Sequence, residues 1–208
     1  MKYFMLIIIL LYTSCSPQLR HSFSKVSSPE KTWVVLHPFK AKKAFILSKE
    51  AERITDSISR IGNIGKDNNG GRSDAFKHSF WMARLTQGIG KRAALSLGKA
   101  HEKGNYKSYK KRKLEDGSLP DKQSSDMDLF NNDVGIKVGS ADKKQPKRIL
   151  IQQLLDSLLI GKLRVLLKDS VGNFLDCHGN IISLDSLQGK WDTKKCLVPS
   201  NKMSFQTE

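Results

Sequence analysis

The segment from Asp74 to Gln87 constrains the fold most, because a helix over these residues is apolar around most of its circumference. Only a narrow polar stripe remains on the helical wheel, and it contains Lys77 and Arg84. A helix with this pattern is stable in water only when other elements cover nearly all of its surface. We therefore expect further helices to surround it.

Helical spacing of apolar residues recurs elsewhere in the chain and predicts those helices. They are expected at about residues 38–47, 48–61, 91–103, 124–139 and 147–160. From Leu163 onward, short runs rich in branched residues alternate with turn residues, which favours small antiparallel strands. No internal repeat is evident. The pattern predicts a mainly α fold, a compact helical domain with a small C-terminal antiparallel β element.

Residues 1–14 have the pattern of an export signal. Lys2 precedes an apolar run from Phe4 to Leu11, which is too short to cross a bilayer as a helix. Small residues then lead into Cys15, an arrangement that resembles the bacterial lipoprotein signal, in which the peptide is cut before a cysteine that receives lipid. An ordinary secretory signal with an incidental cysteine is the alternative. We expect lipidation at Cys15 and a protein anchored to a membrane of the bacterial cell envelope.

The rest of the chain is expected to form one domain on a tether. Residues 15–32 are serine-rich and polar, with Pro17 and Pro29, and are predicted to be the lipid anchor and tether. Residues 33–162 are predicted to be the helical domain that carries the motifs described below. Residues 163–208 are predicted to be a small β and irregular extension.

Two further cysteines, Cys177 and Cys196, lie in the predicted extension. If Cys15 carries lipid, these two form an even pair in an oxidising compartment, which permits one disulfide. The alternative is two separate buried thiols, since sequence spacing does not place the two Cα atoms within bonding distance.

The formal net charge of +16 narrows the choice of partners. Beyond an export signal, the available polyanions are phospholipid head groups, lipopolysaccharide and peptidoglycan, so no nucleic acid is expected. A polar stretch from Gly104 to Ser125 is predicted to be a loop and contains the basic run Lys107–Lys113, with Tyr106 and Tyr109. This run could dock on anionic lipid or polysaccharide, and a solvated loop is the alternative.

Three separated motifs carry the polar residues that helix propensity does not explain: DAFKHSFW at 74–81, AHE at 100–102 and MDLFNNDVG at 127–135. Together and in this order they resemble a bacterial domain family of unknown function with the motifs DAxRHAxW, AHE and MDLxNNxxG. Lys77 stands where that family has arginine. The resemblance covers about residues 70–139 and implies secreted or lipid-anchored bacterial proteins. It suggests an envelope or hydrolytic role but supplies no reaction.

The polar residues of these motifs are predicted to face one another where the helices meet. Two imidazoles with carboxylates are a ligand set suited to zinc or a similar divalent metal, with water in an open position. A remaining carboxylate, Glu102 in the first instance, would then be the general base. The candidate catalytic residues are His78, His101, Glu102 and Asp128, the candidate metal ligands are Asp74, His78 and His101, and the candidate substrate-binding residues are Trp81, Asn131 and Asn132.

Two other interpretations stay open. Without a metal, Asp74 or Asp128 could orient a histidine that acts as general base. In a purely structural interpretation Asp74 caps its helix, Ser125 and Asp128 form a capping box, and the histidines are satisfied core residues. The sequence thus favours a metal-assisted envelope hydrolase of an ester, phosphoester or amide. The alternative is a non-catalytic envelope protein that binds anionic lipid or polysaccharide.

Overall fold

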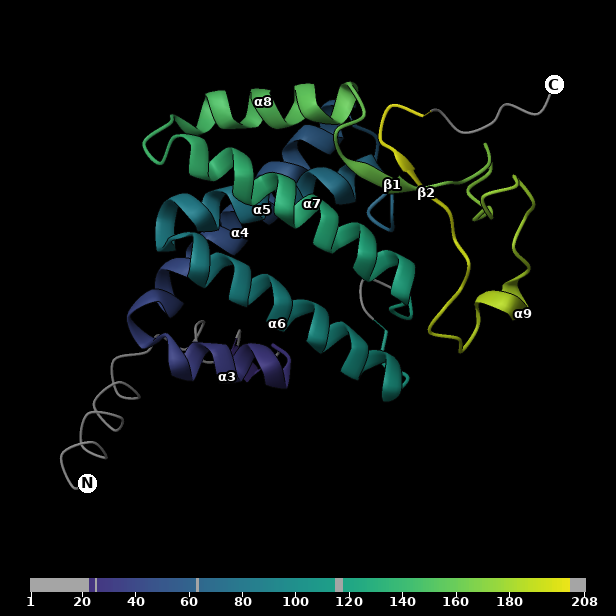
Figure 1. The fold of residues 1–208 in the computed structure, drawn as a ribbon, viewed down its shortest axis with the longest axis horizontal. Helices are drawn as coiled ribbons and strands as arrows, with labels where there is room; N and C mark the ends of the chain where they lie inside the picture. Colours follow the sequence, from purple (N-terminus) through teal and green to yellow (C-terminus); the bar gives the residue numbers. More distant parts are fainter. Residues whose placement is uncertain (1–22, 25, 63, 115–117, 203–208) are drawn as a thin grey trace.

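The computed structural model describes residues 23–202 except residues 25, 63 and 115–117 (Figure 1). The helices are α3 Ser28–Leu36, α4 Pro38–Ile61, α5 Arg72–Ile89, α6 Lys91–Lys110, α7 Lys122–Ala141, α8 Lys147–Leu159 and α9 Leu184–Leu187, and the strands are β1 Arg164–Leu166 and β2 Leu197–Pro199. The strands pair antiparallel, with Val165 opposite Val198. The predicted mainly helical fold with a small C-terminal antiparallel element is confirmed.

The predicted signal peptide and Cys15 lie outside the described residues. Among the helices that are described, none combines the length and the apolar character that crossing a membrane requires.

Helix α5 lies at the centre of the fold and contacts α4, α6, α7, α8 and β1. Its large apolar side chains, including Phe76, Phe80 and Met82, are fully buried. Lys77 and Arg84 are among the few α5 residues that remain partly exposed, as the polar stripe predicted. The surrounding elements therefore enclose α5 on nearly every side.

Helices α5 and α7 approach each other unusually closely because α7 has glycine at the contact. A Cβ atom added at Gly135 would overlap the carbonyl oxygen of Ser79, and one added at Gly139 would overlap that of Ala83. The two glycines lie one helical turn apart, and so do the two α5 residues that they face. Close packing therefore explains why α7 contains glycines that weaken a helix by roughly 1 kcal/mol each relative to alanine.

Helix α3 begins earlier than the predicted folded region. The Ser27 hydroxyl accepts the Glu30 N–H at 3.4 Å, and Glu30 Oε2 accepts the Ser27 N–H at 2.8 Å. This reciprocal capping box starts a helix inside the segment predicted to be a tether. The predicted start near Trp33 is therefore late.

Helix α4 is one continuous element, so the predicted helix start at Ser48 is wrong. The Ser48 hydroxyl donates to the carbonyl oxygen of Ala44 at 3.0 Å and accepts the indole N–H of Trp81 at 2.7 Å. The first bond lies within α4, and the second joins α4 to α5. Ser48 therefore links α4 to α5 and caps no helix.

Helix α6 continues to Lys110, so the loop predicted to start at Gly104 is wrong over its first turns. Gly104 is buried, and a Cβ atom there would overlap the Ser27 side chain. The glycine therefore serves the close approach of the α3 N-terminus to α6 and does not end the helix.

The C-terminal extension packs on the helices and carries a disulfide between Cys177 and Cys196. Arg72 Nε donates to the carbonyl oxygen of Ser200 at 2.8 Å, and the Ser200 hydroxyl donates to that of Leu158 at 2.6 Å. These bonds join the extension to both α5 and α8.

The extension also contains a short repeat, D-x-x-G-N, so the expectation that the chain has no internal repeat is wrong for this segment. In the loops from Asp169 to Asn173 and from Asp176 to Asn180, the aspartate accepts two backbone N–H groups and the asparagine amide. Each aspartate therefore satisfies the turn that follows it.

Replacing Gly135 with alanine is predicted to destabilise the fold by about 1–3 kcal/mol, since its Cβ meets rigid backbone. Urea denaturation measures the free energy of unfolding. The matched control is Gly98→Ala in α6, whose Cβ would meet the flexible Met82 Cε at 3.1 Å. The control should change stability by less than about 1 kcal/mol. Equal losses in the two variants would contradict the close α5–α7 contact.

Candidate functional site

Asp74 lies in the first turn of α5, and its two oxygens have different surroundings. Oδ2 accepts the N–H of Gly70 at 2.9 Å, which ties the carboxylate to the loop before the helix, whereas the N-cap Gly71 has no side-chain capping bond, so the predicted capping role of Asp74 is wrong. Oδ1 pairs with Lys77 Nζ at 2.9 Å and also faces His78. The loop contact therefore occupies only one side of Asp74.

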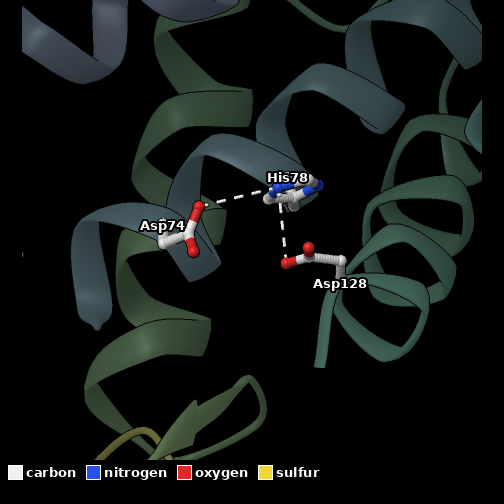
Figure 2. A group of neighbouring side chains, drawn as sticks. All are labelled: Asp74, His78 and Asp128. Atoms are coloured by element: carbon white, nitrogen blue, oxygen red, sulfur yellow. Dashed lines mark ion pairs between the residues drawn. The ribbon is translucent and has the colours of Figure 1, made fainter. Parts of the chain in front are cut away.

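His78 lies between two carboxylates (Figure 2). Its Nε2 is 3.6 Å from Asp74 Oδ1 on the preceding turn of α5 and 3.3 Å from Asp128 Oδ1 on α7. All three side chains are nearly buried, with exposed fractions of 11% for Asp74, 7% for His78 and 9% for Asp128. We call Asp74, His78 and Asp128 the buried triad.

The buried triad could hold a metal ion. One potential ligand atom from each residue lies within 4.8 Å of the other two. Ligand atoms bound at about 2.0–2.1 Å to a tetrahedral zinc are roughly 3.3–3.4 Å apart, close to the two distances from His78 Nε2. A neutral imidazole nitrogen carries at most one hydrogen and cannot donate to both carboxylates. A cation shared by all three residues therefore fits this geometry.

The surroundings of His78 keep its imidazole neutral. Burial lowers the pKa of His78 well below 6.5, and the positive charges of Lys77 and His101 lower it further, while the Asn132 side chain acts in the opposite direction. A metal binds the neutral imidazole, so this environment favours coordination over protonation.

His101 lies beside the buried triad but is held by another residue. Its Nδ1 is 3.1 Å from Glu30 Oε1, and its ring centroid is 6.0 Å from that of His78 and 5.4 Å from that of Trp81. The three residues whose ligand atoms lie close enough to share a metal ion are Asp74, His78 and Asp128. The sequence predicted His101 in place of Asp128. Sequence reasoning missed Glu30, although the pattern Ser27-x-x-Glu30 marks the start of a helix.

Glu102 lies on α6 next to His101, and its carboxylate is buried. Oε2 accepts the Ser125 hydroxyl at 2.7 Å and the Asn105 amide at 3.2 Å. Burial raises the pKa of Glu102, and the negative charge of Asp74 adds to this, although His101 and the two hydrogen bonds oppose it. A carboxylate with a raised pKa is a better proton acceptor than an exposed one.

The capping box predicted for Ser125 and Asp128 is absent at the described start of α7. The helix begins at Lys122, and Asp121 is its N-cap, accepting the Ser124 N–H at 2.9 Å. Ser125 and Asp128 both lie inside the helix, where Ser125 bonds Glu102 and Asp128 faces His78. Both side chains therefore face the site.

The three residues predicted to bind substrate have different surroundings. The Asn131 amide bonds both backbone groups of Arg164 at 2.9 Å, which docks β1 on α7. The Trp81 indole donates to Ser48. Asn132 is buried, influences the pKa of His78, and has no hydrogen-bond partner for its amide among the described residues. We therefore give Asn131 and Trp81 structural roles and keep only Asn132 near the proposed chemistry.

A surface groove of about 490 Å³ lies beside the N-terminus of α5. Its lining includes Gly71, the N-cap of α5, together with Arg72, Lys168 and Lys202. Gly71 is one turn from Asp74, so the groove runs along the end of the helix that carries the triad. The lining also contains Asp67 and Asp169, and Lys168 pairs with Asp67 at 2.6 Å, so the groove has mixed charge, and no residue of the buried triad lines it.

Comparison with known proteins identifies the helical region. A family model described as Domain of unknown function (DUF6973) matches residues 31–162, more than half of the chain. The chain belongs to the DUF6973 family. The chain matches no curated protein and no solved structure. The expected kinship with a family of unknown function is confirmed at this level, and the DUF6973 match contains the whole buried triad.

The Glu30–His101 contact leads to a prediction about acid stability. Burial would raise the pKa of Glu30, but the bond to His101, the charge of His101 and the bonds with Ser27 lower it to about 2. Because this folded-state value lies below the ordinary value of 4.5, the contact stabilises the fold above that pH. The stabilisation is lost as the pH falls from about 4.5 toward about 2.

Glu30→Gln is therefore expected to lower the free energy of unfolding near neutral pH by about 1–3 kcal/mol. The variant should also lose less stability than the natural chain in the acid range, and denaturation across a pH series measures both effects. Glu52→Gln, which removes an exposed ion pair with Lys49, is the control and should change stability by less than about 1 kcal/mol. Identical pH profiles for Glu30→Gln and the natural chain would contradict the assignment.

Proposed function

We propose that this protein is a lipid-anchored protein of the bacterial cell envelope whose DUF6973 domain is a metal-assisted hydrolase of an ester, phosphoester or amide. The observation that carries the metal proposal is the buried triad, in which Nε2 of His78 lies 3.6 Å and 3.3 Å from two carboxylate oxygens. Two buried carboxylates beside a neutral imidazole are costly unless a cation compensates their charge. Zinc or a similar divalent metal meets this requirement.

The metal would be held by Asp74, His78 and Asp128, leaving a position for water. Bound there, a divalent ion lowers the pKa of that water and polarises a carbonyl or phosphoryl oxygen. Lys77 neutralises part of the charge on Asp74 through its 2.9 Å contact with Oδ1. Asn132 lies close to the His78 ring and is the amide best placed to donate to a substrate oxygen.

Glu102 is the proposed general base. Its Oε2 accepts two hydrogen bonds, whereas Oε1 is buried and has no hydrogen-bond partner among the residues that the structure describes. Oε1 is therefore the atom that would accept a proton from water. Glu30 holds the Nδ1 side of the His101 ring, so any proton transfer by His101 would pass through Nε2.

The basic run 107–113 has contacts within its own chain. Lys107 Nζ donates to the Ser28 hydroxyl at 3.0 Å, and Lys110 Nζ lies 4.8 Å from the centre of the Tyr106 ring. These contacts give the run a packing role at the end of α6. Binding of anionic lipid or polysaccharide through this run stays a prediction.

The metal proposal predicts which variants lose the ion. Elemental analysis of the purified full chain should give nearly one divalent metal per protein, and His78→Ala and Asp128→Asn should both lose it. His101→Ala should keep the metal because His101 pairs with Glu30 outside the triad. The control is His178→Ala at an exposed position. Metal retained by His78→Ala, or a metal-free natural chain, would contradict the proposal.

The base assignment predicts a separate effect on catalysis. Glu102→Gln should keep the metal and lower the rate of hydrolysis by about 10²–10⁴-fold. Nitrophenyl esters and nitrophenyl phosphates serve as chromogenic substrates for the natural chain and the variant. Asn105→Ala removes one hydrogen bond to Glu102 and should have a much smaller effect. Full activity in Glu102→Gln would exclude this residue as the base.

A further inference from the structure

The corner between α3 and α4 exposes large apolar side chains. Val35 is 71% exposed, Leu36 is 70% exposed and Phe39 is 97% exposed. We call these three residues the apolar corner. Ile46, which is 54% exposed, follows Phe39 by seven residues and so lies on the same face of α4 two turns further on. Single exposed apolar residues are ordinary, but a group at one corner indicates a contact surface.

The residues of the apolar corner are not the residues through which α3 and α4 pack on the core. Helix α3 already buries Trp33, and α4 already buries Ala44 and Leu47, all of which belong to the hydrophobic core. The side chains of the apolar corner point elsewhere, as their exposure shows. The helices therefore have one face for the core and a second apolar face at the corner.

The chain segment that forms the apolar corner, between Glu30 and Glu50, is basic. From residue 31 to residue 49 the chain has five lysines and no acidic residue. Lys40, Lys42 and Lys43 are exposed and closely follow Phe39. Exposed apolar side chains flanked by lysines are the pattern of a surface that enters the interface of an anionic membrane.

The position of the apolar corner along the chain also favours a membrane. Helix α3 begins only thirteen residues after Cys15, the predicted lipid attachment site. Thirteen extended residues reach at most roughly 45 Å, so a lipid at Cys15 would keep this corner near the bilayer. In Figure 1, α3 lies at the edge of the molecule, where a planar surface can reach it.

We propose that the apolar corner inserts into an anionic phospholipid bilayer, with Lys40, Lys42 and Lys43 contacting the head groups. The contribution of the tether rests on the proposed lipid anchor, whereas the exposure and charge of the corner do not. A protein surface that adds apolar and basic contacts to a lipid anchor strengthens attachment. The contact also fixes which face of the domain is turned toward the membrane.

Quenching by brominated lipids tests the insertion. The full chain with Phe39→Trp is reconstituted in phosphatidylethanolamine–phosphatidylglycerol vesicles whose acyl chains are brominated, and its fluorescence is compared with that of the unsubstituted chain. The control is Val171→Trp, at an apolar position that is 81% exposed in the C-terminal extension. The brominated lipid should quench the fluorescence added by Phe39→Trp and not that added by Val171→Trp. Equal quenching at both positions would overturn the proposal.

The role of charge is tested in the same vesicles. Combined replacement of Lys40, Lys42 and Lys43 with glutamine should reduce the quenching, whereas combined replacement of Lys110, Lys111 and Lys113 should leave it unchanged. Quenching of the Phe39→Trp chain should be reduced in the same way when neutral phosphatidylcholine vesicles replace the anionic ones. Quenching that survives the first replacement, or that is lost only with the second, would overturn the assignment of the head-group contact.

Two further measurements test what covers the apolar corner and whether the lipid anchor exists. Shielding of the Phe39→Trp fluorophore from iodide at rising protein concentration without lipid would identify a second copy as the occupant and overturn the proposal. Incorporation of labelled fatty acid, compared with Cys15→Ser, tests the anchor by itself. Quenching at position 39 without incorporated fatty acid supports the apolar corner and contradicts the anchor, whereas incorporation without quenching overturns the corner.

Discussion

The close contact between α5 and α7 is the constraint on which the rest of the structure depends. Gly135 and Gly139 let α7 lie directly on the backbone of α5 at Ser79 and Ala83. This approach places Asp128, two turns before Gly135, against His78. With any larger residue at the contact the helices would separate, and the carboxylate of Asp128 would move away from the imidazole. The packing of two helices therefore sets the geometry of the candidate site.

The same packing brings two carboxylates close together, and a bound metal would compensate their negative charge. Asp74 and Asp128 both face His78 in a nearly buried environment, where a carboxylate loses much of its hydration. Lys77 offsets part of the charge of Asp74, and the buried imidazole is kept neutral. A divalent cation would compensate both carboxylates and use the neutral nitrogen as a ligand. The cost of burial and the proposed function thus have one explanation.

The periodicity of the sequence predicts the fold class and the burial of α5, because a helix with one narrow polar stripe must be covered. It also predicts that Asp74 and His78 lie one turn apart on the same side of that helix. Glu30 could not be found in this way, since its local pattern marks only a helix start and its partner His101 is 71 residues away. Gly104 was equally misleading because a glycine that permits close packing has the same appearance in sequence as one that ends a helix.

X-ray absorption spectroscopy of the metal-loaded full chain tests the central claim most directly, because it reports the atoms bound to the ion. The buried triad predicts a shell of nitrogen and oxygen atoms with one imidazole, from His78, and carboxylate oxygen from Asp74 and Asp128. A shell with two imidazoles would place His101 on the metal and contradict the assignment of the ligands. A chain that binds no divalent metal would contradict the claim altogether.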